Sequence, residues 1–123
     1  AYAWQRLLKS GTRIACGSDF PVEEPTPWAG LHAAVTRQGA DGRPLGGWYG
    51  KQALSRIQAL DCFTRGAAYA AHREHEIGSL LKGMQADFIL VDVDPLTAPP
   101  QDLLRAKVAQ TWVAGRLIYK RTP

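Results

Sequence analysis

The stretch TRIACGSDFP at residues 12–21 decides how the rest of this sequence is interpreted. Its first five residues are partly β-branched and bounded by glycines, which is typical of a buried strand in an α/β protein. Asp19 would then follow the end of that strand directly. An aspartate there commonly caps the next helix or starts a turn. In an α/β fold it can also face the active-site mouth, where it binds a metal or moves a proton. Position alone leaves both roles of Asp19 open.

The segments on either side of this stretch are predicted to be helical. Residues 2–8 have apolar side chains at roughly helical spacing, and Ser10-Gly11 provides a helix end. Residues 20–27 carry three prolines and two glutamates, which predicts an exposed loop. Pro27 is a suitable first residue for a helix over residues 28–37. A glycine-rich loop over residues 38–50 is expected to follow.

A capping box marks the next helix. In the sequence Ser55-Arg56-Ile57-Gln58, the serine hydroxyl and the glutamine side chain can each satisfy a backbone N–H group at a helix start. We therefore predict a helix from about Arg56. Gly66 predicts a break, followed by a second, closely packed helical segment over residues 67–71.

The last third of the sequence reads as extended structure. Four strands are predicted, over residues 77–81, 86–91, 108–113 and 117–119. Ala114-Gly115-Arg116 has the length of a hairpin connection between the last two strands. Prolines at 95, 99 and 100 indicate a loop, and Leu103-Leu104 could add one helical turn. The chain thus divides into a β/α unit with helices and a small antiparallel sheet.

Length and charge restrict the possible functions. With 123 residues and 46% hydrophobic residues the chain can form one modest core. It is too short for a complete eight-fold β/α barrel, which takes roughly 250 residues. The net charge is +4, but the basic residues are scattered and no run exceeds Lys120-Arg121, so we expect no nucleic-acid partner. Neither a transmembrane stretch nor a signal-peptide pattern is found, and a cytoplasmic location without membrane contact is expected.

The remaining candidate residues have weaker patterns. Cys16 and Cys62 lack CxxC spacing, and we expect both to be small buried hydrophobic residues rather than part of a disulfide framework or a zinc knuckle. His72 and His75, with neighbouring glutamates, do not complete a zinc pattern, and a solvated helix end explains them better. His32 is expected to be a packed or surface residue. Two further patterns, a serine-hydrolase elbow at residue 18 and a phosphate loop in the glycine-rich region, lack the required spacing.

Taken in order, several of these segments together carry a resemblance to a known family. They are Gly17-Ser18-Asp19-Phe20-Pro21-Val22, residues 31–37, residues 54–70, Ile77-Gly78-Ser79-Leu80 and residues 86–92. They resemble the C-terminal end of the amidohydrolase superfamily, in the branch of long metal-dependent hydrolases that includes proteins labelled exoenzyme regulatory. The resemblance implies an α/β fold, with residues 1–76 from the end of a metal-centred β/α barrel. Residues 77–123 would be antiparallel strands of a companion β-sandwich. It also implies that Asp19 binds the metal and handles the proton of the attacking water.

The same resemblance implies that much of the site is supplied elsewhere. The His-x-His pair, the bridging lysine and the further histidines of the family are absent from this sequence. We therefore expect a parent protein that hydrolyses C–N bonds of small amide or cyclic amide substrates with a divalent metal, zinc being favoured. The isolated chain is expected to be inactive, to hold no metal and to self-associate through exposed strand edges. Two alternatives stay open: a non-enzymatic scaffold or regulatory binding module, and a subunit whose histidines come from a second polypeptide.

Overall fold

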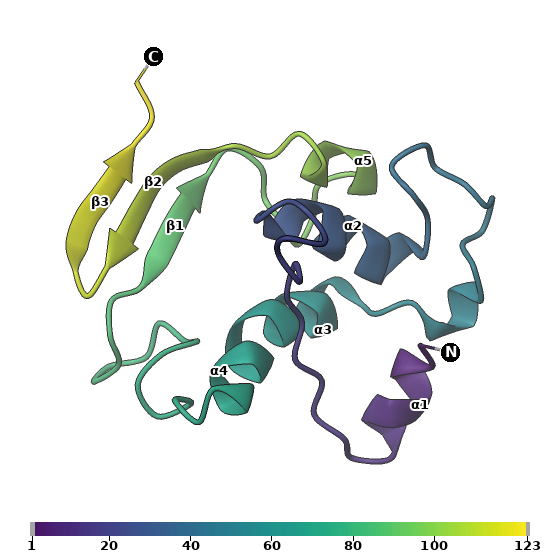
Figure 1. Cartoon of the computed structure of the whole chain (residues 1–123), viewed down its shortest axis with the longest axis horizontal. Coiled ribbons are helices and arrows are strands. Elements are labelled where there is room, and N and C mark those ends of the chain that lie inside the picture. The colour runs from purple at the N-terminus through teal and green to yellow at the C-terminus, as the bar shows by residue number, and fades with distance from the viewer. Residues whose placement is uncertain (1, 123) are drawn as a thin grey trace.

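The computed structural model describes residues 2–122 and consists of a group of short helices with a small sheet projecting from one side (Figure 1). The helical elements are α1 (Trp4–Lys9), α2 (Pro27–Thr36), a 3-10 turn η1 (Gly50–Gln52), α3 (Arg56–Asp61), a π-helical segment η2 (Cys62–Gly66), α4 (Ala67–Ala70) and α5 (Pro100–Leu103). The strands are β1 (Phe88–Val91), β2 (Val108–Val113) and β3 (Arg116–Lys120). The fold is therefore a mixture of helices and a small antiparallel sheet.

Helix α2 begins and ends at residues whose chemistry explains its limits. Pro27 occupies the first turn, as the sequence predicts, and the Thr26 side chain, which the sequence analysis does not single out, accepts a hydrogen bond from the Trp28 N–H. The helix ends at Arg37, which has a left-handed backbone with φ of 60°. The Arg37 guanidinium donates to the carbonyls of Trp48 and Tyr2 and lies over two indole rings, those of Trp4 and Trp48. This buried arginine joins α1, α2 and the loop over residues 38–50.

The predicted capping box is confirmed at the start of α3. The Ser55 side chain accepts from the Gln58 N–H, and the Gln58 side chain accepts from the Ser55 N–H. The predicted break at Gly66 is wrong, because the chain stays helical through η2 into α4. One π-helical turn absorbs the irregularity instead. Gly66 is required for packing there, since a Cβ at this position would lie 2.2 Å from the carbonyl oxygen of Ile14.

The core lies between α2, α3, η2 and α5. Its buried members are Leu31, Ala34, Leu54, Ala59, Cys62 and Leu103. Larger, partly buried side chains from α1, α2, η2 and the segment before Asp19 pack around them, including Trp4, Leu8, Ile14, Cys16, Trp28 and Phe63. Arg56 links this core to the chain that leads towards β2, because its guanidinium donates to the carbonyls of Pro95 and Ala98.

The sheet has the order β1-β2-β3 and is antiparallel throughout. Its β2–β3 turn is the predicted hairpin connection, with positive φ at both Ala114 (49°) and Gly115 (73°), as a type I′ turn requires. Phe88 and Trp112 pair across β1 and β2, with their rings stacked 5.6 Å apart. Six further apolar side chains of the sheet are exposed, and they lie on both faces: Ile89, Leu90, Val113, Leu117, Ile118 and Tyr119. Two-sided exposure of apolar residues indicates a sheet that lacks covering layers among residues 2–122.

Two of the predicted strands are not strands in the structure. Residues 12–16 are irregular and hydrogen-bond through Cys16 to a helix rather than to a neighbouring strand. Residues 77–81 consist of bends and irregular backbone, with Gly78 at a φ of 89°. A strand exists only when its N–H and C=O groups join a ladder, and within residues 2–122 these two segments have no strand beside them. Of the four predicted C-terminal strands, the last three are confirmed.

The expectation that Cys16 and Cys62 do not form a disulfide is wrong. The two residues are joined by a disulfide bond, with their Cα atoms 5.2 Å apart. Cys62 is buried, as expected, while Cys16 is partly buried. Sequence spacing misled here because the pair is separated by 46 residues and meets only when the segment before Asp19 docks on η2.

Candidate functional site

Asp19 lies at the start of an exposed loop between the core and α2. Its backbone is left-handed, with φ of 58°, and its carbonyl accepts a hydrogen bond from the Val22 N–H, forming a tight turn. The residue is exposed, and within residues 2–122 its carboxylate has no hydrogen-bond partner. Thr26, not Asp19, caps α2. The helix-cap interpretation is therefore wrong, whereas the alternative that Asp19 starts a turn is confirmed.

The segment before Asp19 is fixed to the helices along one side. The Cys16 N–H donates to the Cys62 carbonyl at 3.1 Å, next to the disulfide between the same residues. Ile14 lies directly against Gly66, and the Arg13 guanidinium lies 4.2 Å from the centre of the Tyr69 ring. These contacts fix the direction in which the chain reaches Asp19.

A cavity of about 580 Å³ lies beside the same segment. Its lining includes residues from the segment before Asp19, from α3 and η2, and from the loop over residues 74–84, such as Arg13, Asp61, Arg65, Glu74, His75 and Met84. Asp19 does not line this cavity. The cavity and the free carboxylate are therefore separate features of the described chain.

The histidines do not assemble around Asp19. His75 is exposed, and its ring lies 3.9 Å from Glu74, its neighbour in sequence. His32 is buried on α2, where the Gln101 side-chain amide lies 3.2 Å from its Nε2 atom. Burial, and secondarily the Arg56 guanidinium, hold the pKa of His32 below its ordinary value, so this ring is a neutral, packed residue. Across residues 2–122, no group of three or more His, Cys, Asp or Glu side chains could hold a metal ion.

The sequence singles out Asp19 as a candidate but does not predict the contacts that hold the segment before it. The Cys16–Cys62 pair and the close approach of Ile14 to Gly66 depend on tertiary packing, and no local pattern signals either contact. The sequence pattern around Gly66 predicts a helix break. A glycine within an apolar helix can equally indicate close approach of another backbone, which is the alternative that applies here.

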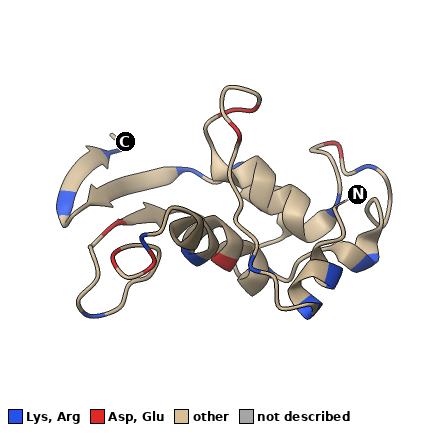
Figure 2. Cartoon of the chain, turned by 60° about the horizontal axis from the view of Figure 1, so that its bottom comes forward, with Lys and Arg blue, Asp and Glu red and all other residues tan. Residues whose placement is uncertain are grey.

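The charged residues are distributed along the whole chain. Figure 2 shows Lys and Arg on helices, loops and the end of the sheet, interspersed with Asp and Glu. Two of the exposed ion pairs, Arg65–Asp61 and Arg73–Glu76, are local contacts within three or four residues. Among residues 2–122, none of the helices has both the length and the apolar character needed to cross a membrane.

Comparisons with known proteins match almost the whole chain. The family model described as "Amidohydrolase family" matches residues 1–119. N-substituted formamide deformylase of Arthrobacter pascens is 32% identical over 116 residues, covering 94% of this chain and 21% of that protein. Protein LONG AFTER FAR-RED 3 of Arabidopsis thaliana is 32% identical over 119 residues, covering 97% of this chain and 20% of that protein. The chain thus spans about a fifth of the length of these relatives.

A solved structure shares the fold. The amidohydrolase from Thermotoga maritima superimposes with a TM-score of 0.68 at 22% identity, over 98% of this chain and 26% of that one. At this identity the likeness concerns the fold alone. The match extends over the helices and the sheet together, so the Thermotoga maritima protein contains both in a similar arrangement as part of its longer chain.

Proposed function

Because this chain belongs to the amidohydrolase family, we propose that it is the C-terminal part of a longer metal-dependent hydrolase that cleaves C–N bonds of small amide-type substrates. Asp19 would be its contribution to the active site. The formamide deformylase among its relatives is named for removing a formyl group from an N-substituted formamide, which is cleavage of this kind. The observation that carries the proposal is the free, exposed carboxylate of Asp19 at the end of a segment fixed to the helices.

The chemistry of Asp19 suits a metal ligand. A carboxylate is a hard oxygen donor that binds divalent cations, including zinc. A metal held in such a site supplies a water molecule whose pKa is lowered towards neutrality. Asp19 would be one of the residues that hold the ion, and its carboxylate would accept a proton during hydrolysis. A carboxylate already engaged as a helix cap would be less available for either task.

The described residues alone do not fit a complete metal site. No cluster of three donors exists within residues 2–122, and one carboxylate does not hold zinc tightly. We propose that the remaining ligands lie in the part of the longer protein that this chain does not include. The isolated chain would then be inactive and metal-free.

The arrangement of the chain supports a two-part layout in that protein. We propose that residues 1–76 belong to the end of a β/α barrel and residues 77–123 to a β-sandwich. Residues 12–16 have the composition of a strand. One side of this segment is hydrogen-bonded to helices, and the other has no strand partner among residues 2–122. The sheet has apolar side chains exposed on both faces. Each feature suits an element that is covered by further structure.

Without such cover, we propose that the isolated chain self-associates. Both β1 and β3 are edge strands of the three-stranded sheet, and β3 is exposed along its whole length. Unpaired edges and exposed apolar faces are the usual routes to association between copies.

The test compares the 123-residue chain with the longer protein. Zinc measured by elemental analysis should be stoichiometric in the longer protein and absent from the short chain. Asp19→Asn should weaken metal binding in the longer protein by at least about a hundredfold, since even residues that only support a ligand contribute 10- to 100-fold. Glu24→Gln is the matched control, because it removes the same charge from the same exposed loop.

Three results would redirect the proposal. Stoichiometric zinc in the short chain that is lost on Asp19→Asn would mean that the described residues suffice. Full metal binding and hydrolysis by the longer Asp19→Asn protein would show that Asp19 is not part of the active site. A longer protein that binds no metal and hydrolyses no amide would favour a scaffold or regulatory binding module.

A further inference from the structure

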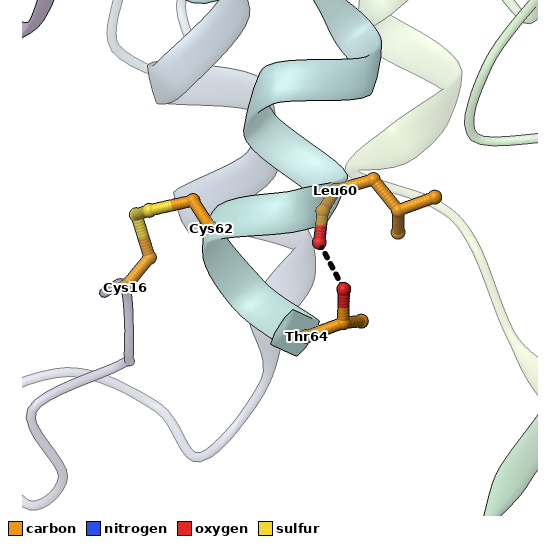
Figure 3. The surroundings of a disulfide bond; sticks show 4 residues. All are labelled: Cys16, Leu60, Cys62 and Thr64. Atoms are coloured by element: carbon orange, nitrogen blue, oxygen red, sulfur yellow. Dashed lines mark hydrogen bonds between the residues drawn. A yellow bond between two sulfur atoms is a disulfide. The ribbon is translucent and has the colours of Figure 1, made fainter. Parts of the chain in front are cut away.

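The disulfide bond lies at one end of the loop that carries Asp19. Figure 3 shows Cys16 on the irregular segment and Cys62 on the helix, with their sulfur atoms joined. Cys16 precedes Asp19 by only three residues. We propose that Cys16 and Cys62 form a reversible redox pair that controls the position of Asp19, an inference that rests on the proposed role of this carboxylate.

The loop has few other attachments. Between Cys16 and the start of α2, the backbone hydrogen bonds are local ones, from Val22 to Asp19 and from Thr26 to Glu24. Within residues 2–122, no side-chain hydrogen bond or ion pair ties residues 17–25 to the rest of the chain. As far as covalent links, hydrogen bonds and ion pairs of residues 2–122 are concerned, Cys16 and the N-terminus of α2 are therefore the two points that hold this loop.

On the helix side, Cys62 is the first residue of the π-helical segment. Its carbonyl accepts the Cys16 N–H, a hydrogen bond to a residue outside the helix. Thr64 donates its hydroxyl hydrogen to the Leu60 carbonyl at 2.7 Å, giving this irregular turn a side-chain partner (Figure 3). Single π turns within α-helices are frequent at functional sites. Here the turn presents the Cys62 sulfur and carbonyl together to the segment that leads to Asp19.

The exposure of the two cysteines favours exchange with a thiol. Cys62 is buried, while Cys16 is partly exposed, so an incoming thiolate would attack the Cys16 sulfur. The S–S bond breaks, and the Cys62 sulfur leaves as a thiolate that is then protonated. A second thiol of the reductant attacks the mixed disulfide and releases the Cys16 thiol. In total two electrons and two protons pass to the protein from a dithiol, which becomes a disulfide.

After reduction, the hydrogen bond from the Cys16 N–H to the Cys62 carbonyl is the contact nearest to the loop that still joins its first end to the helix. A single backbone hydrogen bond contributes only about 1 kcal/mol net. The loop that carries Asp19 should then open more often. In a compartment that keeps thiols reduced, a disulfide that forms is usually a transient, catalytic or redox-sensing one.

The test begins with the thiols of the 123-residue chain. Purified without reductant, the chain should take up no iodoacetamide by mass spectrometry, and after treatment with dithiothreitol it should take up two groups. Glutathione disulfide should restore the unreactive form. Thiols that stay free in the presence of this oxidant would overturn the proposal.

The second measurement is amide hydrogen exchange of residues 17–26. Dithiothreitol should accelerate exchange of the two hydrogen-bonded amides of this loop, those of Val22 and Thr26, several-fold and leave exchange in β2 unchanged. The variant Cys16→Ser/Cys62→Ser should show the fast rate with and without dithiothreitol, which separates reduction of this bond from other effects of the reagent. Equal loop exchange in the oxidised and reduced chains would contradict control of the loop by the disulfide.

The third measurement uses the longer protein and connects the loop to the site. Reduction should weaken its zinc affinity, while the double serine variant should be insensitive to reduction. If Asp19→Asn leaves metal binding intact, the proposed function fails, but the thiol and exchange results stand. If Asp19→Asn abolishes metal binding and reduction has no effect on it, only the redox proposal fails.

Discussion

Gly66→Ala tests the docking of the segment that leads to Asp19 on the helices. An alanine Cβ at this position would lie 2.2 Å from the Ile14 carbonyl oxygen and 3.3 Å from the Asp61 carbonyl oxygen. Since ordinary contacts begin at 3.4 Å, the segment must retreat by about 1 Å, the kind of backbone shift that overpacking forces. This movement would also stretch the hydrogen bond from the Cys16 N–H to the Cys62 carbonyl, now 3.1 Å.

The expected cost follows from opposing contributions. Overpacking costs about 1–3 kcal/mol, and the weakened hydrogen bond adds up to about 1 kcal/mol. Replacing glycine by alanine within a helix recovers about 1 kcal/mol. A clash with a backbone carbonyl at 2.2 Å places the overpacking cost in the upper half of its range, about 2–3 kcal/mol, so we expect Gly66→Ala to lower the free energy of unfolding by about 1–3 kcal/mol overall.

Urea unfolding at low micromolar concentration measures this difference. With a slope of about 2 kcal/mol per molar urea, the midpoint should fall by roughly 0.5–1.5 M. Gly30→Ala is the control: its Cβ would meet the tip of the Phe63 ring at 2.6 Å, and a ring can tilt away where a carbonyl cannot. A Gly66→Ala chain as stable as the wild type, or more stable, would refute the close packing described for Ile14.

Three further predictions concern other parts of the chain. Because the pKa of His32 is lowered in the folded state, the unfolded state binds more protons between the two pKa values. The free energy of unfolding should therefore be greatest above about pH 7 and fall as the pH drops through about 6.5. His32→Gln should flatten this part of the plot of unfolding free energy against pH. His75→Gln, at an exposed position, is the control and should leave it unchanged. Arg37→Lys should destabilise the fold by about 1–3 kcal/mol in urea unfolding, because lysine cannot span two carbonyls and two indole rings. An unchanged urea midpoint would show that a positive charge at this position is enough for stability. The isolated chain should elute from size-exclusion chromatography as an oligomer whose size rises with concentration, and Ile118→Lys, on exposed β3, should reduce it; a monomer across micromolar concentrations would contradict the proposed self-association.

Local chemistry allowed much of the fold to be predicted from the sequence. The capping box at Ser55, the first-turn proline of α2 and the Ala114-Gly115 hairpin depend on residues within four positions of each other. Each was found where the pattern placed it. These features need no knowledge of distant parts of the chain.

The features that could not be predicted depend on contacts over long separations. Residues 12–16 have the composition of a strand, but a strand also needs a neighbour, and sequence composition says nothing about that neighbour. The cysteine pair meets across 46 residues. For Asp19 the sequence indicated a position before a loop, and the structure adds that its carboxylate is exposed and does not cap α2. Its catalytic role stays a prediction.

Arg56 has a consequence for how cooperatively the chain unfolds. Its guanidinium holds the carbonyls of Pro95 and Ala98, in the connection between β1 and α5, whereas the strands of the sheet contact chiefly one another. The helices and the sheet are thus coupled largely through this connection. Heating should therefore melt the helices and the sheet in separate steps, and loss of the Arg56 side chain should widen the temperature interval between them. In calorimetry the chain would then show two transitions rather than one.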